Sequence, residues 1–138
     1  MLVSVNWLKK DFHMEAANEE GGKIRMDGKT SIGGLEGGIS PMQLLLAGIG
    51  GCSAIDVISI LEKQKQDLTD LKVEVDADRQ HTDVGYSEFK TIHMHFIFSG
   101  DLDPKKVERA LKLSITKYCS VSKALEKGSE ISYDYKIV

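Results

Sequence analysis

The amino-terminal third of the chain shows the period of two that is typical of β-strands. The alternating apolar residues are Val3, Val5 and Trp7 in a first segment and Phe12, Met14 and Ala16 in a second. Successive side chains of a strand point to opposite faces, so this pattern predicts a hairpin with one buried face. Ile24 and Met26, after two glycines, predict a third short strand.

A capped helix is the clearest local signal in the sequence. Ser40 precedes Pro41, and Gln43 lies three residues after Ser40, which is a capping box with proline at the first helical position. The segment 44–61 is apolar, with Asp56 as its only charged residue, and the chain turns polar at 62–67. We therefore expect the helix to end there.

This helix is too long and too apolar for one small sheet to cover. At about 1.5 Å per residue, a continuous helix over 41–66 would be about 39 Å long, whereas a compact domain of this size has a radius of gyration of about 14 Å. It is apolar nearly all round, so every side of it must be covered. The sequence predicts a homodimer in which two such helices pair, with Gly48, Gly50 and Gly51 allowing close approach.

A transmembrane helix is the alternative for this segment. About 18 apolar residues reach only the lower edge of a membrane span. Three glycines and Asp56 interrupt the segment, and the amphipathic strands on both sides need an apolar partner that this helix supplies. We therefore predict no membrane association.

The second half of the chain predicts two more strands, two helices and a final strand. Residues 71–77 and 92–98 alternate between apolar and polar positions, as do 131–137. Asp103 and Pro104 form a second helix start with a capping residue before a proline, and apolar residues continue at helical spacing to about Tyr118. A short helix over 122–127 ends at Gly128. The predicted fold class is α+β.

Composition and charge narrow the setting. The 138 residues predict a single domain over 1–138, with 41% hydrophobic and 28% charged residues, which is a globular composition. A net charge of -3 argues against nucleic acid or an anionic membrane as a partner. Two cysteines are too few for a disulfide scaffold, and Met1 leads into the first strand without a basic segment. We therefore expect a cytosolic, cytoplasmic protein.

Cys52 and Cys119 are the candidate reactive residues. They lie 67 positions apart (119 minus 52), which excludes a CxxC redox pair and any zinc motif of clustered cysteines. If Gly50 and Gly51 break the helix, Cys52 starts a new helical segment, whose dipole favours the thiolate. In a continuous helix, burial and Asp56 disfavour it. Cys119 lies between two helices, where we expect it to be the more accessible.

Other motifs give weaker evidence of a functional site. His93 and His95 share one face of a strand, but no third ligand is identifiable, so we interpret them as part of a solvated face. The glycines of 33–40 have the spacing of a phosphate-binding loop, but Ile39 replaces the lysine. A loop before a capped helix is sufficient explanation. No cofactor and no metal site are expected.

Two segments resemble the osmotically induced protein C and organic hydroperoxide resistance family, OsmC/Ohr. Residues 38–57, GISPMQLLLAGIGGCSAIDV, are similar to the family's proline-led helix with its first cysteine, and 117–121, KYCSV, to the segment around the second. The resemblance implies antiparallel β-sheets wrapped around a long central helix in an intertwined homodimer. It implies further that Cys52 is the attacking cysteine and Cys119 the resolving one.

Two departures from the family pattern keep a second function open. Met42 stands where the family has a glutamate after the proline, and Lys9-Lys10-Asp11 where its hairpin arginine would lie, with Arg25 the only nearby arginine. The leading function is reduction of organic hydroperoxides, with a dithiol as reductant. The alternative is a dimeric, non-catalytic module that binds a small hydrophobic ligand in an interfacial pocket. A structural protein without chemistry is a third possibility.

Overall fold

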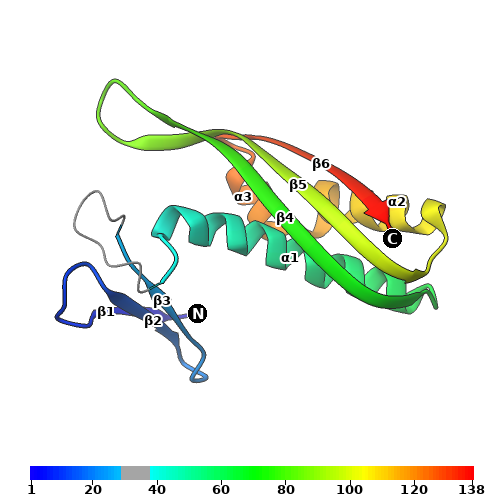
Figure 1. Cartoon of the computed structure of the whole chain (residues 1–138), viewed down its shortest axis with the longest axis horizontal. Helices are drawn as coiled ribbons and strands as arrows, with labels where there is room; N and C mark the ends of the chain where they lie inside the picture. Colours follow the sequence, from blue (N-terminus) through cyan, green and yellow to red (C-terminus); the bar gives the residue numbers. More distant parts are fainter. Residues whose placement is uncertain (29–37) are drawn as a thin grey trace. The chain divides into compact units, whose positions relative to one another are not determined.

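The computed structural model describes residues 1–28 and 38–138, and these divide into two compact units, Met1–Leu45 and Leu46–Val138. The fold class is α+β, as predicted, with two three-stranded sheets and one long helix (Figure 1). Most of the glycine loop assigned to 33–40 lies outside the described residues. The expectation of a single domain over 1–138 stays a prediction.

The first unit contains the predicted hairpin and third strand. β1 (Val3–Trp7), β2 (Met14–Asn18) and β3 (Lys23–Met26) form an antiparallel sheet in that order. Val5 pairs with Ala16, and Ala16 with Ile24, so the apolar residues share one face as expected. That face is only partly buried, since Ala16 and Met26 are each 8% exposed whereas Trp7 is 55% exposed. The described residues of this unit, 1–28 and 38–45, place no second layer on the three short strands.

The helix α1 (Pro41–Lys63) is continuous. The capping box is present: the Ser40 amide donates to Gln43 Oε1 at 2.9 Å, and the Gln43 amide donates to Ser40 Oγ at 3.2 Å. At about 1.5 Å per residue its 23 residues are about 35 Å long. Lys65 follows with a φ of 55°, and the Gln66 amide bonds back to the Leu61 carbonyl at 3.0 Å, which ends the helix near the predicted place.

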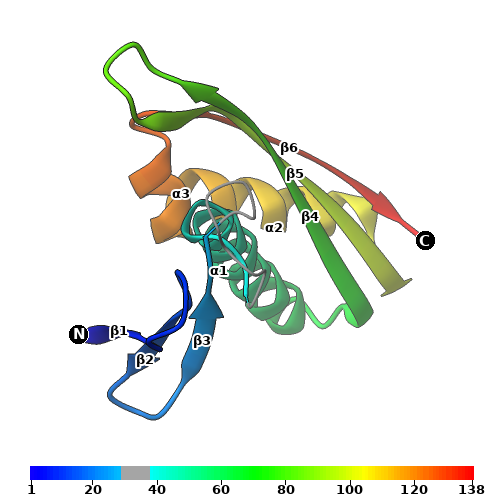
Figure 2. The same cartoon turned by 60° about the vertical axis from the view of Figure 1, so that its left-hand side comes forward.

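The second unit places helices on one face of a sheet. β4 (Asp67–His81) and β5 (Ser87–Asp101) form a long hairpin, and α2 (Pro104–Leu113), a π-helical turn (Ser114–Tyr118), α3 (Ser120–Leu125) and β6 (Glu130–Ile137) follow. α1 and α2 run along the same face of the sheet (Figures 1 and 2). Helix α2 ends earlier than expected, at Leu113.

The second sheet is mixed, whereas antiparallel sheets were expected. β4 pairs with β5 in antiparallel register, but β6 lies parallel to β5, with Ile92 opposite Ile131 and Phe98 opposite Ile137. The helices between β5 and β6 return the chain to the end of the sheet where β5 began, so the next strand runs in the same direction.

The core of this unit lies between the sheet and the helices. Its largest fully buried side chains come from α1, β5 and α2, and include Ile49, Val57, Leu61, Ile92, Met94, Phe96, Phe98, Val107 and Leu111. α1 approaches β4 closely, because a Cβ added to Gly50 would lie 3.0 Å from Val75 Cγ2. The residues predicted to face inward on β5 do so.

The opposite side of α1 is left uncovered. Ile55 is 70% exposed and Ile58 is 44% exposed, so the described residues of the second unit do not supply the expected cover on every side. By length and composition α1 also qualifies as a membrane span, with a mean hydropathy of 2.1. The core helix of a soluble protein passes the same test, and the full burial of Ile49, Val57 and Leu61 fits that role.

Candidate functional site

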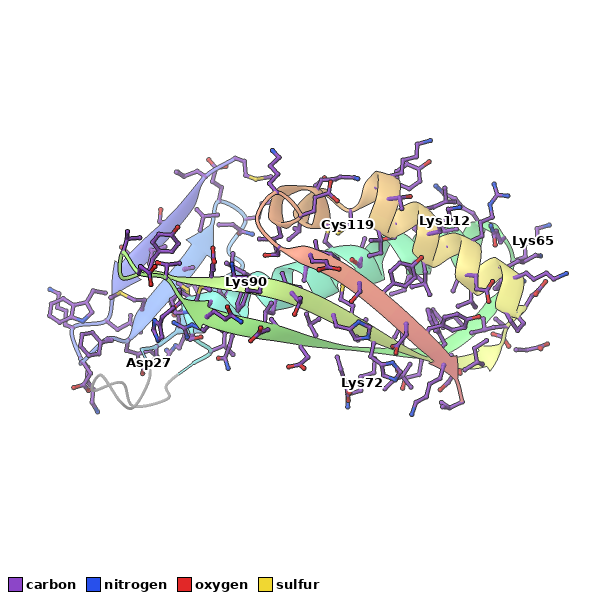
Figure 3. All side chains as sticks on the ribbon, turned by 90° about the horizontal axis from the view of Figure 1, so that it is seen from above. Asp27, Lys65, Lys72, Lys90, Lys112 and Cys119 are labelled. Carbon is purple, nitrogen blue, oxygen red and sulfur yellow. The ribbon has the colours of Figure 1, made fainter. Side chains whose placement is uncertain are left out.

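The fold brings the two cysteines together with an aspartate. Cys52 and Asp56 lie one turn apart on α1, and Cys119 caps the amino terminus of α3. One ligand atom of each, Sγ or a carboxylate oxygen, lies within 4.8 Å of the other two. Figure 3 labels Cys119 where the segment after α2 joins α3. Two thiols 67 positions apart in sequence are therefore neighbours in space.

The accessibility of the two cysteines is opposite to the expectation for Cys119. Cys119 is fully buried and Cys52 is half-buried. Although Tyr118 in the turn between α2 and α3 is 50% exposed, the next side chain, Cys119, packs against Ser53 of α1: Ser53 Oγ donates to Cys119 Sγ at 3.3 Å. The Ser122 amide donates to the same sulfur at 3.3 Å. Cys52 is therefore the thiol that a solute can reach.

The surroundings of Cys119 keep it protonated at neutral pH. Burial raises the pKa of the Cys119 thiol, because the charged form loses its hydration, and this outweighs the donors from Ser53 and Ser122, which act in the other direction. A buried thiol of this kind is a weak nucleophile until it loses its proton.

Helix α1 shows which of the two expected backbone geometries surrounds Cys52. The helix is continuous through Gly50 and Gly51, so Cys52 does not start a new helical segment. Asp56 lies one helical turn after Cys52, as expected for a continuous helix. Among the ion pairs of residues 1–28 and 38–138, none involves Asp56.

Ser114 ties the π-helical turn to this cluster. Its hydroxyl is fully buried and donates to Asp56 Oδ2 at 3.1 Å, with the Ser53 carbonyl oxygen at 3.4 Å. The Cys119 amide donates to the Ser114 carbonyl at 2.7 Å, across five residues. Such π-type turns occur frequently at functional sites. This turn replaces the end of the predicted α2 and carries Cys119 to its position.

Sequence reasoning identified both cysteines and Asp56 but missed the serines. Ser53, Ser114 and Ser122 are fully buried. A serine within an apolar helix was the single available signal, and it applies to Ser53 alone, because the other two lie in segments that read as ordinary amphipathic helix.

A cavity of about 490 Å³ adjoins the cluster. It is lined by Asp56, Ser59, Ile60, Lys63, Gln64, Arg109, Leu113 and Tyr118. Asp56 thus belongs both to the cavity wall and to the thiol cluster. The volume is within the range of sites for small organic molecules, and the wall combines apolar side chains with two cations.

The histidines lie elsewhere, on the outer face of the second sheet. His93 and His95 both contact Asp134 on β6, and His93 Nδ1 lies 2.7 Å from Ser132 Oγ. The hydrogen bond from His95 holds the pKa of the Asp134 carboxyl below its usual range. The side chains of His93, His95 and Asp134 are 43%, 31% and 60% exposed, in agreement with a solvated face.

Comparison with known proteins places the chain in a family. Residues 33–134 match the model of the OsmC-like protein family, and the chain belongs to it. Protein YhfA of Escherichia coli strain K12 is 40% identical over 140 residues, which cover 100% of this chain and 98% of YhfA.

Solved structures share the fold. A hypothetical protein from Aquifex aeolicus VF5 is 28% identical, with a TM-score of 0.80 over 99% of this chain and 96% of that one. The organic hydroperoxide resistance protein OhrB of Bacillus subtilis superposes with a TM-score of 0.69 at 16% identity, covering 98% and 96%. At that identity the likeness shows the fold alone. α1 is the core helix of this fold.

Proposed function

We propose that this protein reduces organic hydroperoxides through its two cysteines, with Cys52 as the attacking thiol and Cys119 as the resolving thiol. The observation that carries the proposal is the pair of thiols within 4.8 Å, one half-buried and one fully buried. Cys52, the accessible thiol, reacts with the hydroperoxide, and Cys119, the buried thiol, then reacts with the oxidised Cys52.

The chemistry balances with these two groups and a dithiol. The Cys52 thiolate attacks the distal oxygen of the hydroperoxide, the O–O bond breaks, and the departing alkoxide takes a proton to become an alcohol. The resulting sulfenic acid condenses with Cys119, which forms a disulfide and releases water. A dithiol then reduces the disulfide by thiol exchange, so the protein is expected in a reducing compartment such as the cytoplasm.

The cavity beside Asp56 supports an organic substrate. Its apolar wall, with Ile60, Leu113 and Tyr118, suits the hydrocarbon part of a hydroperoxide. Hydrogen peroxide has no such part and gains nothing from this wall. We expect larger organic hydroperoxides to react faster than hydrogen peroxide for this reason.

The proposal includes a homodimer. Among the described residues, exposed apolar side chains lie on the side of α1 around Ile55 and on the face of the first sheet that carries Val5 and Trp7. Both lie on regular elements, and a second copy would offer the same two surfaces in return. A reciprocal exchange between copies covers both at once.

Family membership and fold add support. The chain belongs to the OsmC-like family over 33–134, and the Bacillus subtilis protein of the same fold is an organic hydroperoxide resistance protein. The shared fold and the two adjacent thiols together support peroxide reduction as the function of this site.

The experiment is stopped-flow turnover of cumene hydroperoxide with dithiothreitol. Cys52→Ser is expected to abolish consumption, while Cys119→Ser completes one turnover and stops at the sulfenic acid or a more oxidised form. Ser132→Ala, on the outer face of the second sheet beside His93, is the matched control and should keep both steps. Turnover that persists in Cys52→Ser contradicts the proposal.

A second candidate function is the non-catalytic ligand-binding module. The cavity of about 490 Å³ favours it, because its wall includes Ile60, Leu113 and Tyr118 but neither cysteine. Alkylation distinguishes the two: a reactive Cys52 is modified in the folded protein, whereas a packing residue is modified only on unfolding. A binding module would also retain hydrophobic ligands in the cavity after both cysteines are replaced.

A further inference from the structure

The cluster of Cys52, Asp56 and Cys119 has the composition of a metal site. It offers two sulfurs and one carboxylate from two separate segments, all mutually within 4.8 Å. Fully deprotonated, the three groups carry three negative charges, and no ion pair within the described part of the chain neutralises Asp56. A thiophilic cation would neutralise this charge.

The distances are close to those of a tetrahedral site. Zinc binds thiolate sulfur at about 2.3 Å and carboxylate oxygen at about 2.0 to 2.2 Å, so tetrahedral ligands lie about 3.5 to 3.8 Å apart. Because no two of the ligand atoms are more than 4.8 Å apart, each pair has to approach by no more than about 1.3 Å. Rotation of a cysteine side chain about its Cα–Cβ bond supplies a movement of this size without displacing the helices.

The groups behind the ligands are also in place. The Ser114 hydroxyl donates to the Asp56 carboxylate at 3.1 Å and so orients it. The Ser53 hydroxyl and the Ser122 amide donate to Cys119 Sγ, both at 3.3 Å, where they would stabilise a thiolate. Hydrogen bonds of this kind to the ligands are the usual outer support of metal sites.

A tetrahedral ion held by these three residues would have one position left for a further ligand. Three protein ligands leave one site for water or an exogenous ligand, which is the pattern of reactive rather than structural zinc sites. Asp56 also lines the cavity of about 490 Å³, which gives the site a route to small molecules.

We propose that the reduced protein binds one zinc ion, or a similar thiophilic divalent cation, through Cys52, Asp56 and Cys119. The sequence spacing excluded a motif of clustered cysteines, but it did not exclude ligands that the fold assembles. The proposed metal site uses the same two thiols as the proposed peroxide chemistry, so metal binding and peroxide reduction compete. This competition, unlike the metal site itself, rests on the proposed function.

The competition follows from the electron balance. A hydroperoxide that oxidises the zinc-bound thiolates takes two electrons from them, and with two protons it becomes an alcohol and water. The thiolates become a disulfide, which no longer binds the cation, and Zn²⁺ is released unchanged. The disulfide form should therefore have no zinc affinity at this site, and bound zinc should slow oxidation.

The test is a titration of reduced, metal-free protein with zinc chloride against a chromophoric chelator. We expect one zinc per chain with a dissociation constant of about 1 μM or lower near neutral pH, with release of protons on binding. Asp56→Asn should weaken binding at least about tenfold, and Cys119→Ser more. Glu62→Gln, an exposed carboxylate on the same helix, is the control and should leave binding unchanged. Cobalt(II) provides a second readout through its thiolate charge-transfer absorbance.

The outcomes separate the inference from the proposed function. Wild-type protein without zinc or cobalt binding, or with binding unchanged in Asp56→Asn and Cys52→Ser, overturns the metal site. Peroxide turnover is measured in parallel with excess chelator. Turnover that depends on Cys52 in a protein without metal affinity leaves the proposed function intact, whereas metal binding without such turnover removes the function and the competition but keeps the site. Circular dichroism of each variant verifies that it is folded.

Discussion

Replacement of Ile55 by glutamate tests whether a second copy covers the open side of α1. Ile55 is 70% exposed in the single chain, so most of its surface is still available for burial. Full burial of an isoleucine side chain contributes about 1.5 to 3 kcal/mol, and the part still available is therefore about 1 to 2 kcal/mol. In a two-fold symmetric dimer the residue counts twice, about 2 to 4 kcal/mol in total.

This energy corresponds to a large change in association. At 1.4 kcal/mol for each factor of ten, Ile55→Glu should weaken the dimer by about 30-fold to 1,000-fold, and the burial of two charges adds to the effect. The free energy of unfolding of the separated monomer should change by no more than about 0.5 kcal/mol, because the side chain is exposed there. The variant should therefore be a folded monomer.

The measurement is light scattering coupled to size-exclusion chromatography over the micromolar range. Ile97→Glu is the matched control, since Ile97 lies on the outer face of the second sheet, in register with Lys72 and Lys136, where a glutamate is well placed. It should leave the dimer unchanged. Wild-type protein that elutes as a monomer throughout this range, or an Ile55→Glu variant that associates like wild type, would refute the reasoning.

Two further predictions concern packing and pH. Gly50→Ala should destabilise the chain by about 1 to 2 kcal/mol in urea unfolding, because the added Cβ would lie 3.0 Å from Val75 and the overlap outweighs the gain in helix propensity. Gly128→Ala, with open space around its Cβ, is the comparison, and equal stability of the two variants would count against the close approach. Burial raises the pKa of the Cys119 thiol in the folded protein. The protonated thiol therefore contributes its full stabilisation below the unfolded-state pKa of about 8.5, and this contribution declines as the pH rises toward the folded-state pKa. In this range the free energy of unfolding should fall by up to about 1.4 kcal/mol per pH unit, and this fall should be absent in Cys119→Ala. Identical alkaline slopes in the two proteins would show that another group is responsible.

The sequence by itself determined the elements that depend on neighbours along the chain. The capping box needs only Ser40, Pro41 and Gln43, and its two hydrogen bonds are those expected. Alternation predicted the strands, because a strand turns its side chains to opposite faces whatever it packs against. The proline-led helix with Cys52 and the later segment with Cys119 identified the family, to which the match over 33–134 assigns the chain.

Only the tertiary structure decided how these elements meet. No local pattern shows that β6 lies parallel to β5, because the direction depends on how the intervening helices cross the sheet. The burial of Cys119 and its hydrogen bond from Ser53 depend on the turn after α2 packing against α1, 66 residues away in the chain. Burial, hydrogen bonding and the charge beside a thiol are properties of contacts between distant segments, and these determine the reactivity of a cysteine.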